Sequence, residues 1–110
     1  MLKEAKIILP VEHNGEATTW SFLRRVVAEF GGYTAIRAEG AWTAAPDGRI
    51  VIEPVIVVTV ALPPLAAVVS QFRDLAEAAR VEFAQEAIYI QLPNGDVEFV
   101  TVETTAERAA

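Results

Sequence analysis

The sequence predicts an α+β fold in which an antiparallel sheet carries two helices on one of its faces. Strand-like and helix-like segments follow one another as strand, helix, strand, strand, helix, strand and a final short strand. Residues 45–49, APDGR, form a turn of the kind that joins two antiparallel strands. The two flanking strands sort their side chains into one apolar and one mixed face, which indicates a sheet covered by helices on one side only.

Length and composition indicate one globular domain. The chain has 110 residues, of which 53% are hydrophobic and 22% charged, enough to bury a core without covalent staples. We expect residues 1–104 to form this domain and residues 105–110, which are polar and rich in alanine, to fray.

Charge and cysteine content exclude several classes of function. The net charge is −6, and an acidic surface repels the phosphates of nucleic acids. No cysteine is present, which excludes a disulfide framework, a thiolate nucleophile and a zinc ribbon and fits a cytoplasmic protein. The longest apolar stretch, residues 55–69, contains Thr59 and a Pro-Pro pair and is too short to span a bilayer. We therefore expect no nucleic-acid or membrane partner.

The first half of the chain predicts a strand, a loop and a helix. Residues 5–11, AKIILPV, read as a strand, and the mainly polar residues 12–17, EHNGEA, read as a loop. Thr18 or Thr19 is placed to cap a helix over residues 20–30, which Gly31-Gly32 ends. The apolar residues at helical spacing, expected to face the core, are Trp20, Leu23, Val26, Val27 and Phe30.

The central hairpin is expected to join strands over residues 33–43 and 49–62. A three-residue turn pairs Ala45 with Arg49 and therefore places Trp42 opposite Ile52 and Arg37 opposite Val57. The helix-covered face then collects Ile36, Trp42, Ile50, Ile52, Ile56, Val58 and Val60. The mixed face collects Arg37, Glu39, Thr43, Glu53 and Thr59 with Val51, Val55 and Val57.

The second half predicts a long helix and a second hairpin. Residues 65–85 carry a continuous apolar stripe at helical spacing, beginning directly after Pro63-Pro64. Residues 87–92 and 97–102 read as short strands around the turn Pro93-Asn94-Gly95, with their register left open.

This order of elements is the ferredoxin-like βαββαβ plan with a short C-terminal strand added. The chain resembles small bacterial ferredoxin-like families of unknown function. The residues that carry the resemblance are Trp20 and Phe22, FGGYT at 30–34, GAW at 40–42, the PDG turn and FAQEAIYIQL at 83–92. More generally it is similar to dimeric α+β barrel proteins, in which two such sheets pack face to face. That resemblance implies a fold, and its broader group includes monooxygenases, isomerases and proteins that only bind small molecules.

Two residues are weak candidates for catalysis. His13 is the sole histidine and lies in the polar loop, where it is either a general acid or base or an exposed loop residue. Glu53 interrupts an otherwise apolar strand and is followed by Pro54. With Arg37 and Glu39 it is a candidate for ligand binding in a pocket, and the alternative is an ion pair with Arg37 across the strands. Pro54 favours an edge position or a bulge.

The remaining polar and aromatic residues favour structural roles. We expect Tyr33, Trp42 and Tyr89 to pack in the core more readily than to line a ligand cleft. Arg24 and Arg25 read as a solvated helix face rather than an anion clamp. No phosphate-binding loop, nucleophile elbow or metal-ligand motif occurs in the sequence, so no cofactor and no metal are indicated.

These observations favour a non-catalytic, self-associating binding or accessory domain. Its expected partner is a second copy, in a homodimer through the mixed face with Val51, Val55 and Val57 at the interface, although another protein partner is possible. The alternative is a small enzyme of the dimeric α+β barrel kind, monooxygenase- or isomerase-like, with Glu53 or His13 transferring a proton. A phage- or plasmid-encoded inhibitor of a host protein is a third hypothesis.

Overall fold

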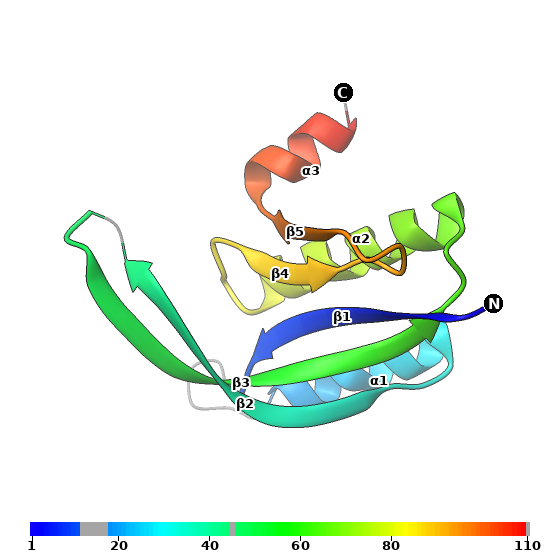
Figure 1. Ribbon diagram of the computed structural model, residues 1–110, viewed down its shortest axis with the longest axis horizontal. Coiled ribbons are helices and arrows are strands. Elements are labelled where there is room, and N and C mark those ends of the chain that lie inside the picture. Colours follow the sequence, from blue (N-terminus) through cyan, green and yellow to red (C-terminus); the bar gives the residue numbers. More distant parts are fainter. Residues whose placement is uncertain (12–17, 45, 110) are drawn as a thin grey trace.

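A computed structural model describes residues 1–11, 18–44 and 46–109. It contains one five-stranded antiparallel sheet and three helices, which confirms the α+β class. The strands pair in the order β2-β3-β1-β4-β5, and Figure 1 shows both long helices behind the sheet. The elements are β1 (Lys3–Pro10), α1 (Thr18–Phe30), β2 (Thr34–Ala44), β3 (Arg49–Leu62), α2 (Ala66–Glu82), β4 (Ile88–Gln91), β5 (Val97–Val100) and α3 (Val102–Ala109).

The core lies between the sheet and the helices α1 and α2. Alternate residues of the central strands are fully buried on this side, as a half-covered sheet requires. The two helices meet through edge-to-face aromatic pairs, Phe22 with Phe83 and Phe30 with Phe72, whose ring centroids are 5.4 and 5.8 Å apart. The strand residues that contribute to the core are Ala5, Ile7, Leu9, Ile56, Val58, Val60, Leu62, Ile88, Ile90 and Val100.

The inward face of α1 differs from the predicted one. Trp20 and Val27 are exposed, whereas Phe22, Leu23 and Val26 are buried. Thr19 is also buried, and its hydroxyl donates a 2.5 Å hydrogen bond to the Pro10 carbonyl. This bond ties the start of α1 to the end of β1, and Trp20, the next residue, is 41% exposed.

The hairpin register is one residue away from the predicted register. Ala44, not Ala45, pairs with Arg49, so Trp42 lies opposite Val51 and Ile36 opposite Val57. The Gly48 N–H donates to the Ala44 carbonyl at 3.0 Å, and Gly48 has a φ of +75°. A longer turn than the predicted three-residue one therefore closes the hairpin, and every side chain of β2 moves to the face opposite the predicted one.

The far end of the hairpin extends beyond the rest of the sheet. β3 is paired to β1 only up to Val55, which lies opposite Pro10. From Pro54 outward β3 has β2 as its neighbour, and the pairing continues without a bulge. Pro54 thus lies where the strand has lost one of its two neighbours, in agreement with the edge position. We call residues 39–44 and 46–54 the arm, and Figure 1 shows it projecting away from the helices.

The C-terminal residues form a helix where the sequence predicted the end of a strand and a frayed tail. β5 ends at Val100, and α3 follows immediately. The Thr101 hydroxyl accepts the Thr104 N–H at 3.1 Å, and the Thr104 hydroxyl accepts the Thr101 N–H at 2.7 Å. This reciprocal capping fixes the first turn of α3. Among the described helices, none is long and apolar enough to cross a membrane.

Candidate functional site on the open sheet face

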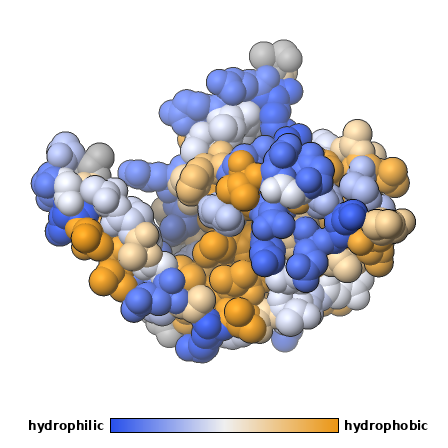
Figure 2. All heavy atoms as spheres, viewed as in Figure 1, coloured by the Kyte–Doolittle hydropathy of each residue, from blue (hydrophilic) through white to orange (hydrophobic). Residues whose placement is uncertain are grey.

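The sheet has one face that the described elements leave uncovered, and we call it the open face. In the view of Figure 1 it is turned toward the reader, because α1 and α2 lie behind the strands. Figure 2 shows hydrophobic atoms gathered over the middle of this face. The ladder pairings place on it Lys6 and Ile8 of β1, Ile36, Ala38, Gly40 and Trp42 of β2, Arg49, Val51, Glu53, Val55, Val57 and Thr59 of β3, Tyr89 and Gln91 of β4, and Val97 and Phe99 of β5.

Large apolar side chains on the open face are exposed to an extent that is unusual for a monomeric surface. Ile36 is 62%, Phe99 57% and Trp42 46% exposed. A contiguous patch of this kind marks a binding site for a ligand or a partner. The predicted placement of Ile36 and Trp42 in the helix-covered core is therefore wrong, and the one-residue shift of register is its cause.

Glu53 lies in the part of the open face that belongs to the arm. Its ladder partner is Gly40, so no side chain stands beside the carboxylate on β2. A Cβ at Gly40 would come within 3.3 Å of a methyl group of Val55, whose side chain leans over the glycine. The next pair outward is Trp42 with Val51. Glu53 is thus a half-buried residue. The neighbouring residues on the same face are Val55, Val51 and Trp42, which carries an indole.

A second aromatic group lies on the two strands at the other edge of the face. Tyr89 and Phe99 are opposite each other in the β4–β5 ladder, and their rings pack edge to face with centroids 5.6 Å apart. Tyr89 is half-buried there rather than in the core. Phe99 is not among the residues predicted for the site, although its place in the alternating segment VEFV indicates a side chain facing opposite to Val100.

The predicted cluster of Arg37, Glu39 and Glu53 does not form. In the observed register Arg37 and Glu39 pair with Ile56 and Pro54, and they share the opposite face of the sheet from Glu53. The ion pairs among the described residues do not include Arg37 with Glu53. Of the other candidates, Val51 and Val57 are half-buried on the open face, Val55 is 7% exposed, and His13 lies outside the described residues.

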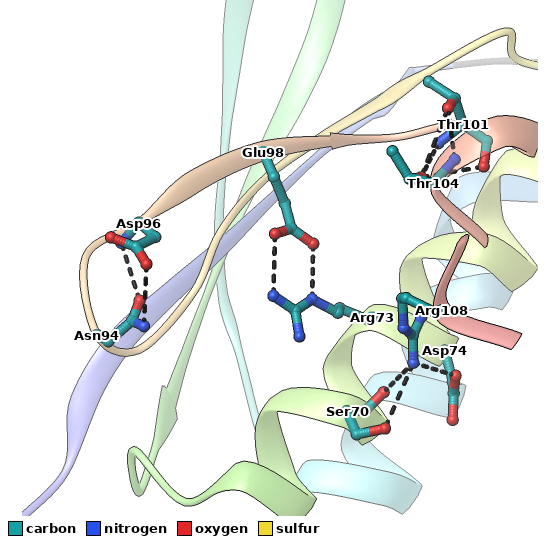
Figure 3. A network of polar contacts seen from close by, with 9 residues as sticks. All are labelled: Ser70, Arg73, Asp74, Asn94, Asp96, Glu98, Thr101, Thr104 and Arg108. Carbon is teal, nitrogen blue, oxygen red and sulfur yellow. Dashed lines mark hydrogen bonds and ion pairs between the residues drawn. The ribbon is translucent and has the colours of Figure 1, made fainter. Parts of the chain in front are cut away.

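The polar interactions gather on the helix side, away from the open face. Arg73 of α2 donates two parallel hydrogen bonds to Glu98 of β5, at 2.7 and 3.0 Å, and this pairing raises the pKa of Arg73 (Figure 3). Arg108 of α3 reaches Asp74 at 2.9 Å and the Ser70 hydroxyl at 3.3 Å. These contacts fasten β5 and α3 to α2.

One carboxylate of this network is strongly held in its charged form. Glu77 accepts hydrogen bonds from Arg80 at 2.8 and 2.5 Å and from the Thr105 hydroxyl at 2.9 Å. The Arg80 hydrogen bonds, with a smaller contribution from Thr105, lower the pKa of Glu77 against the opposing effect of burial, and the same pairing raises the pKa of Arg80. Because these groups are already partnered, we assign them a structural role.

Two surface clefts lie on the helix side. One, of about 770 Å³, is lined by residues where α2 ends and α3 begins, including Arg80, Glu86 and Glu103. The other, of about 670 Å³, lies between α1 and α2 and is lined by Phe22, Arg25 and Glu77 among others. Neither contains Glu53 or an aromatic pair. Of their charged residues, Arg25, Asp74, Glu77 and Arg80 are engaged in ion pairs, whereas Glu82, Glu86 and Glu103 are in none of the ion pairs of the described residues. The open face therefore remains the better candidate site.

The open face suits a flat, apolar ligand. Aromatic rings stack on nucleobases, and both aromatic faces and carboxylates attract cations. Within the described ranges, no three histidine or acidic side chains gather as a metal site. The chemistry available on the face is thus that of one carboxylate, Glu53, and two cationic side chains, Lys6 and Arg49, beside exposed aromatic and aliphatic side chains.

Comparison with known proteins gives likenesses of structure. No protein-family model matches the chain, and no curated protein sequence matches it. A phage SAM lyase in complex with S-methyl-5'-thioadenosine superposes with a TM-score of 0.70 over 93% of this chain and 91% of the lyase chain, at 18% identity. A phage SAM lyase in the apo state gives a TM-score of 0.55 over 91% of this chain and 89% of the lyase chain, at 21% identity. At these identities the likeness establishes a shared fold.

This comparison corrects the functional expectation drawn from the sequence. A non-catalytic binding or accessory role was favoured because candidate catalytic residues are sparse. That prediction is wrong, because both matched structures are of an enzyme and one of them holds a small-molecule ligand. The alternative reaction classes, monooxygenase and isomerase, are not those of the matched lyase either. The chain thus has the fold of an enzyme that acts on a small molecule.

Proposed function

We propose that the chain is a lyase that cleaves S-adenosylmethionine (SAM) and releases S-methyl-5'-thioadenosine. The observation that carries the proposal is the overlap with a phage SAM lyase bound to that nucleoside, over nine-tenths of both chains. The exposed aromatic residues and the carboxylate of the open face support it. They offer stacking for adenine and an anion for the positively charged sulfur of the substrate.

The reaction needs little from the protein beyond binding and orientation. The bond between the sulfonium sulfur and the methionine γ-carbon breaks, and its electron pair stays on sulfur, which becomes the neutral thioether of the product. The γ-carbon is either attacked by the substrate's own carboxylate, giving a lactone, or it becomes part of an alkene when a base removes a proton from the β-carbon. In the second route Glu53 is the base, and in the first it stabilises and orients the sulfonium centre.

The finer topology is part of the same proposal. The order β2-β3-β1-β4, with α1 after β1 and α2 after β3, supports assigning residues 1–92 to the ferredoxin-like plan. β5 and α3 are then additions at one edge of the sheet, and residues 1–109 form a single domain.

Self-association and location remain proposals as well. The exposed apolar side chains of the open face support a homodimer in which a second copy covers part of this face, with Val51 and Val57 at the contact. Val55, which is only 7% exposed, contributes less than predicted. A cytoplasmic location agrees with the proposed substrate, which cells make and use there.

Incubation of the purified protein with SAM tests the proposal. We expect S-methyl-5'-thioadenosine to accumulate in step with the loss of SAM, measured by chromatography with mass detection. S-adenosylhomocysteine, whose sulfur carries no positive charge, is expected to remain intact because its leaving group is poor. If folded protein leaves SAM unchanged at concentrations where it is associated, the proposed function is wrong.

The variant Glu53→Gln locates the reaction on the open face. We expect a loss of roughly a hundredfold or more in the rate of cleavage, with the midpoint of urea unfolding unchanged. Glu39→Gln is the matched control, because Glu39 lies on the same arm but faces the opposite side. Equal rates of cleavage for Glu53→Gln and Glu39→Gln would show that Glu53 is not part of the site, without contradicting the proposed activity.

A further inference from the structure

A row of polar side chains crosses four adjacent strands of the open face, at the end away from the arm. Thr59 of β3 pairs with Thr34 of β2 and with Lys6 of β1, and Lys6 pairs with Gln91 of β4. We call these four residues the polar row. Lys6, Thr59 and Gln91 are half-buried, and their side chains take part in none of the hydrogen bonds and ion pairs found between described residues. Their donors and acceptors are therefore available to a ligand.

The neighbouring row, on the side of the arm, is apolar and aromatic. Ile8 lies two residues after Lys6 on β1, and Tyr89 lies two residues before Gln91 on β4, so all four side chains point to the open face. Tyr89 packs edge to face with Phe99 in this row. A planar base that lies over these side chains presents its edge to the polar row.

The distance from Glu53 to the polar row matches the length of the proposed substrate. Six residues of β3 separate Glu53 from Thr59, which corresponds to about 20 Å. In an extended SAM molecule, ordinary bond lengths place the sulfonium sulfur roughly 11 Å from the amino group of adenine. A contact of about 3–4 Å at each end brings the span of the bound molecule close to the distance between Glu53 and the polar row. With its sulfur at Glu53, the substrate thus reaches Lys6 and Gln91 with the edge of its base.

We propose that the polar row determines the specificity for adenine, an inference that deepens the proposed function and rests on it. The Gln91 amide accepts a hydrogen bond from the 6-amino group through its oxygen, and its NH₂ group is able to donate to the adjacent ring nitrogen, as glutamine does when it recognises adenine in DNA. The Lys6 ammonium has donors only, so it donates to a ring nitrogen. Neither residue reaches the sulfur, so both act on recognition of the base and not on the cleavage step.

Calorimetric titration with two nucleosides tests the assignment without any turnover. The first is S-methyl-5'-thioadenosine, and the second is its analogue with unsubstituted purine in place of adenine, which lacks the amino group. We expect the wild-type chain to bind the analogue roughly tenfold more weakly, because Gln91 then has no partner. Gln91→Leu is expected to bind both nucleosides equally and as weakly as the wild type binds the analogue. Gln71→Leu, on the exposed surface of α2, is the matched control and is expected to keep the wild-type preference.

Steady-state kinetics with SAM separates recognition of the base from catalysis. Gln91→Leu and Lys6→Met are each expected to raise KM about tenfold and to leave kcat within about twofold, because the lost contact is the same in the ground state and the transition state. Lys3→Met is the control for the second variant. Lys3 is also on β1 but faces the opposite side of the sheet, so neither constant is expected to change.

The outcomes distinguish this inference from the proposed function. Equal affinity of the wild-type chain for the two nucleosides overturns the inference, as does a folded Gln91→Leu variant that keeps the preference for adenine. A fall in kcat with an unchanged KM overturns it as well. In each of these cases the proposed function stands as long as SAM is cleaved. A chain that neither binds S-methyl-5'-thioadenosine nor cleaves SAM overturns the proposed function, and the inference with it.

Discussion

Glu53 lies directly opposite Gly40 in the β2–β3 ladder, so that the carboxylate has no neighbouring side chain on the adjacent strand. The space above the glycine is taken up instead by the side chain of Val55. The charged Glu53 and the closely packed Gly40 and Val55 therefore lie together where the arm leaves the sheet.

Replacement of Gly40 by valine fills the position beside the carboxylate. The Cβ of the new side chain alone would lie 3.3 Å from a methyl group of Val55. We therefore expect a destabilisation of about 1–3 kcal/mol from overpacking. The rate of SAM cleavage is expected to fall by more than the decrease in the fraction of folded protein accounts for. Gly32→Ala is the matched control, because a Cβ at Gly32 meets nothing within 4 Å. Urea unfolding and the rate of product formation measure the two effects, and an active Gly40→Val enzyme would contradict the placement of the site.

Phe99→Ala removes one ring of the aromatic pair on β4 and β5. The ring is more than half exposed, so we expect stability to change by less than about 1 kcal/mol. If adenine stacks there, the affinity for S-methyl-5'-thioadenosine falls by roughly tenfold or more, as the loss of a base–aromatic contact of about 1–3 kcal/mol requires. Val97→Ala, an exposed aliphatic neighbour on the same face of β5, is expected to leave affinity nearly unchanged. Isothermal titration calorimetry compares the three proteins.

Phe72→Ala tests the opposite side of the sheet. Phe72 is fully buried and packs edge to face against Phe30, so we expect a loss of about 3–5 kcal/mol in the free energy of unfolding. Denaturant unfolding measures this loss. A cost below that of the Phe99 variant would show that the core does not lie between the sheet and the two long helices.

Protonation of Glu77 is expected to loosen α3. The pKa of Glu77 is lower in the folded protein than in the unfolded chain, chiefly because of its hydrogen bonds from Arg80. A lowered pKa stabilises the fold fully above the ordinary value of about 4.3, and this stabilisation is lost as pH falls through the lower, folded value. In hydrogen exchange, the amides of α3 should therefore lose protection at acid pH.

Variants distinguish this effect from general acid unfolding. Glu77→Gln is expected to remove most of the acid-dependent change, since glutamine does not titrate, whereas Glu82→Gln on the exposed side of the same helix is expected to preserve it. Retention of the full pH dependence in Glu77→Gln would assign the effect to another carboxylate.

The alternation within each strand was readable from the sequence, but the register between strands was not. In β3 the burial of Ile56, Val58 and Val60 on one face follows from the side-chain period of two. The relation of β2 to β3 depended on the length of one turn, and APDGR fits a shorter and a longer turn equally well. The longer one moved Ile36 and Trp42 onto the open face and separated Arg37 from Glu53.

Two other features needed tertiary information. The start of α1 is held by the hydrogen bond from Thr19 to Pro10, which joins residues nine positions apart in the sequence. Helix α3 begins directly after a strand, and Val102 continued the strand pattern of residues 97–100. A threonine cap at Thr101, an acidic residue in the first turn and Arg108 in the last were helix signals that the strand pattern obscured.

The central claim, that a nucleoside binds on the open face, is tested most directly by titrating the ¹⁵N-labelled protein with S-methyl-5'-thioadenosine. The chain has two tryptophans, whose indole N–H signals report on opposite sides of the molecule: Trp42 on the open face and Trp20 on the outer side of α1. We predict that the Trp42 signal and the amides around Glu53 shift, whereas the Trp20 signal stays in place. Shifts confined to the cleft around Arg80 and Glu103, or no shifts at saturating nucleoside, would contradict it.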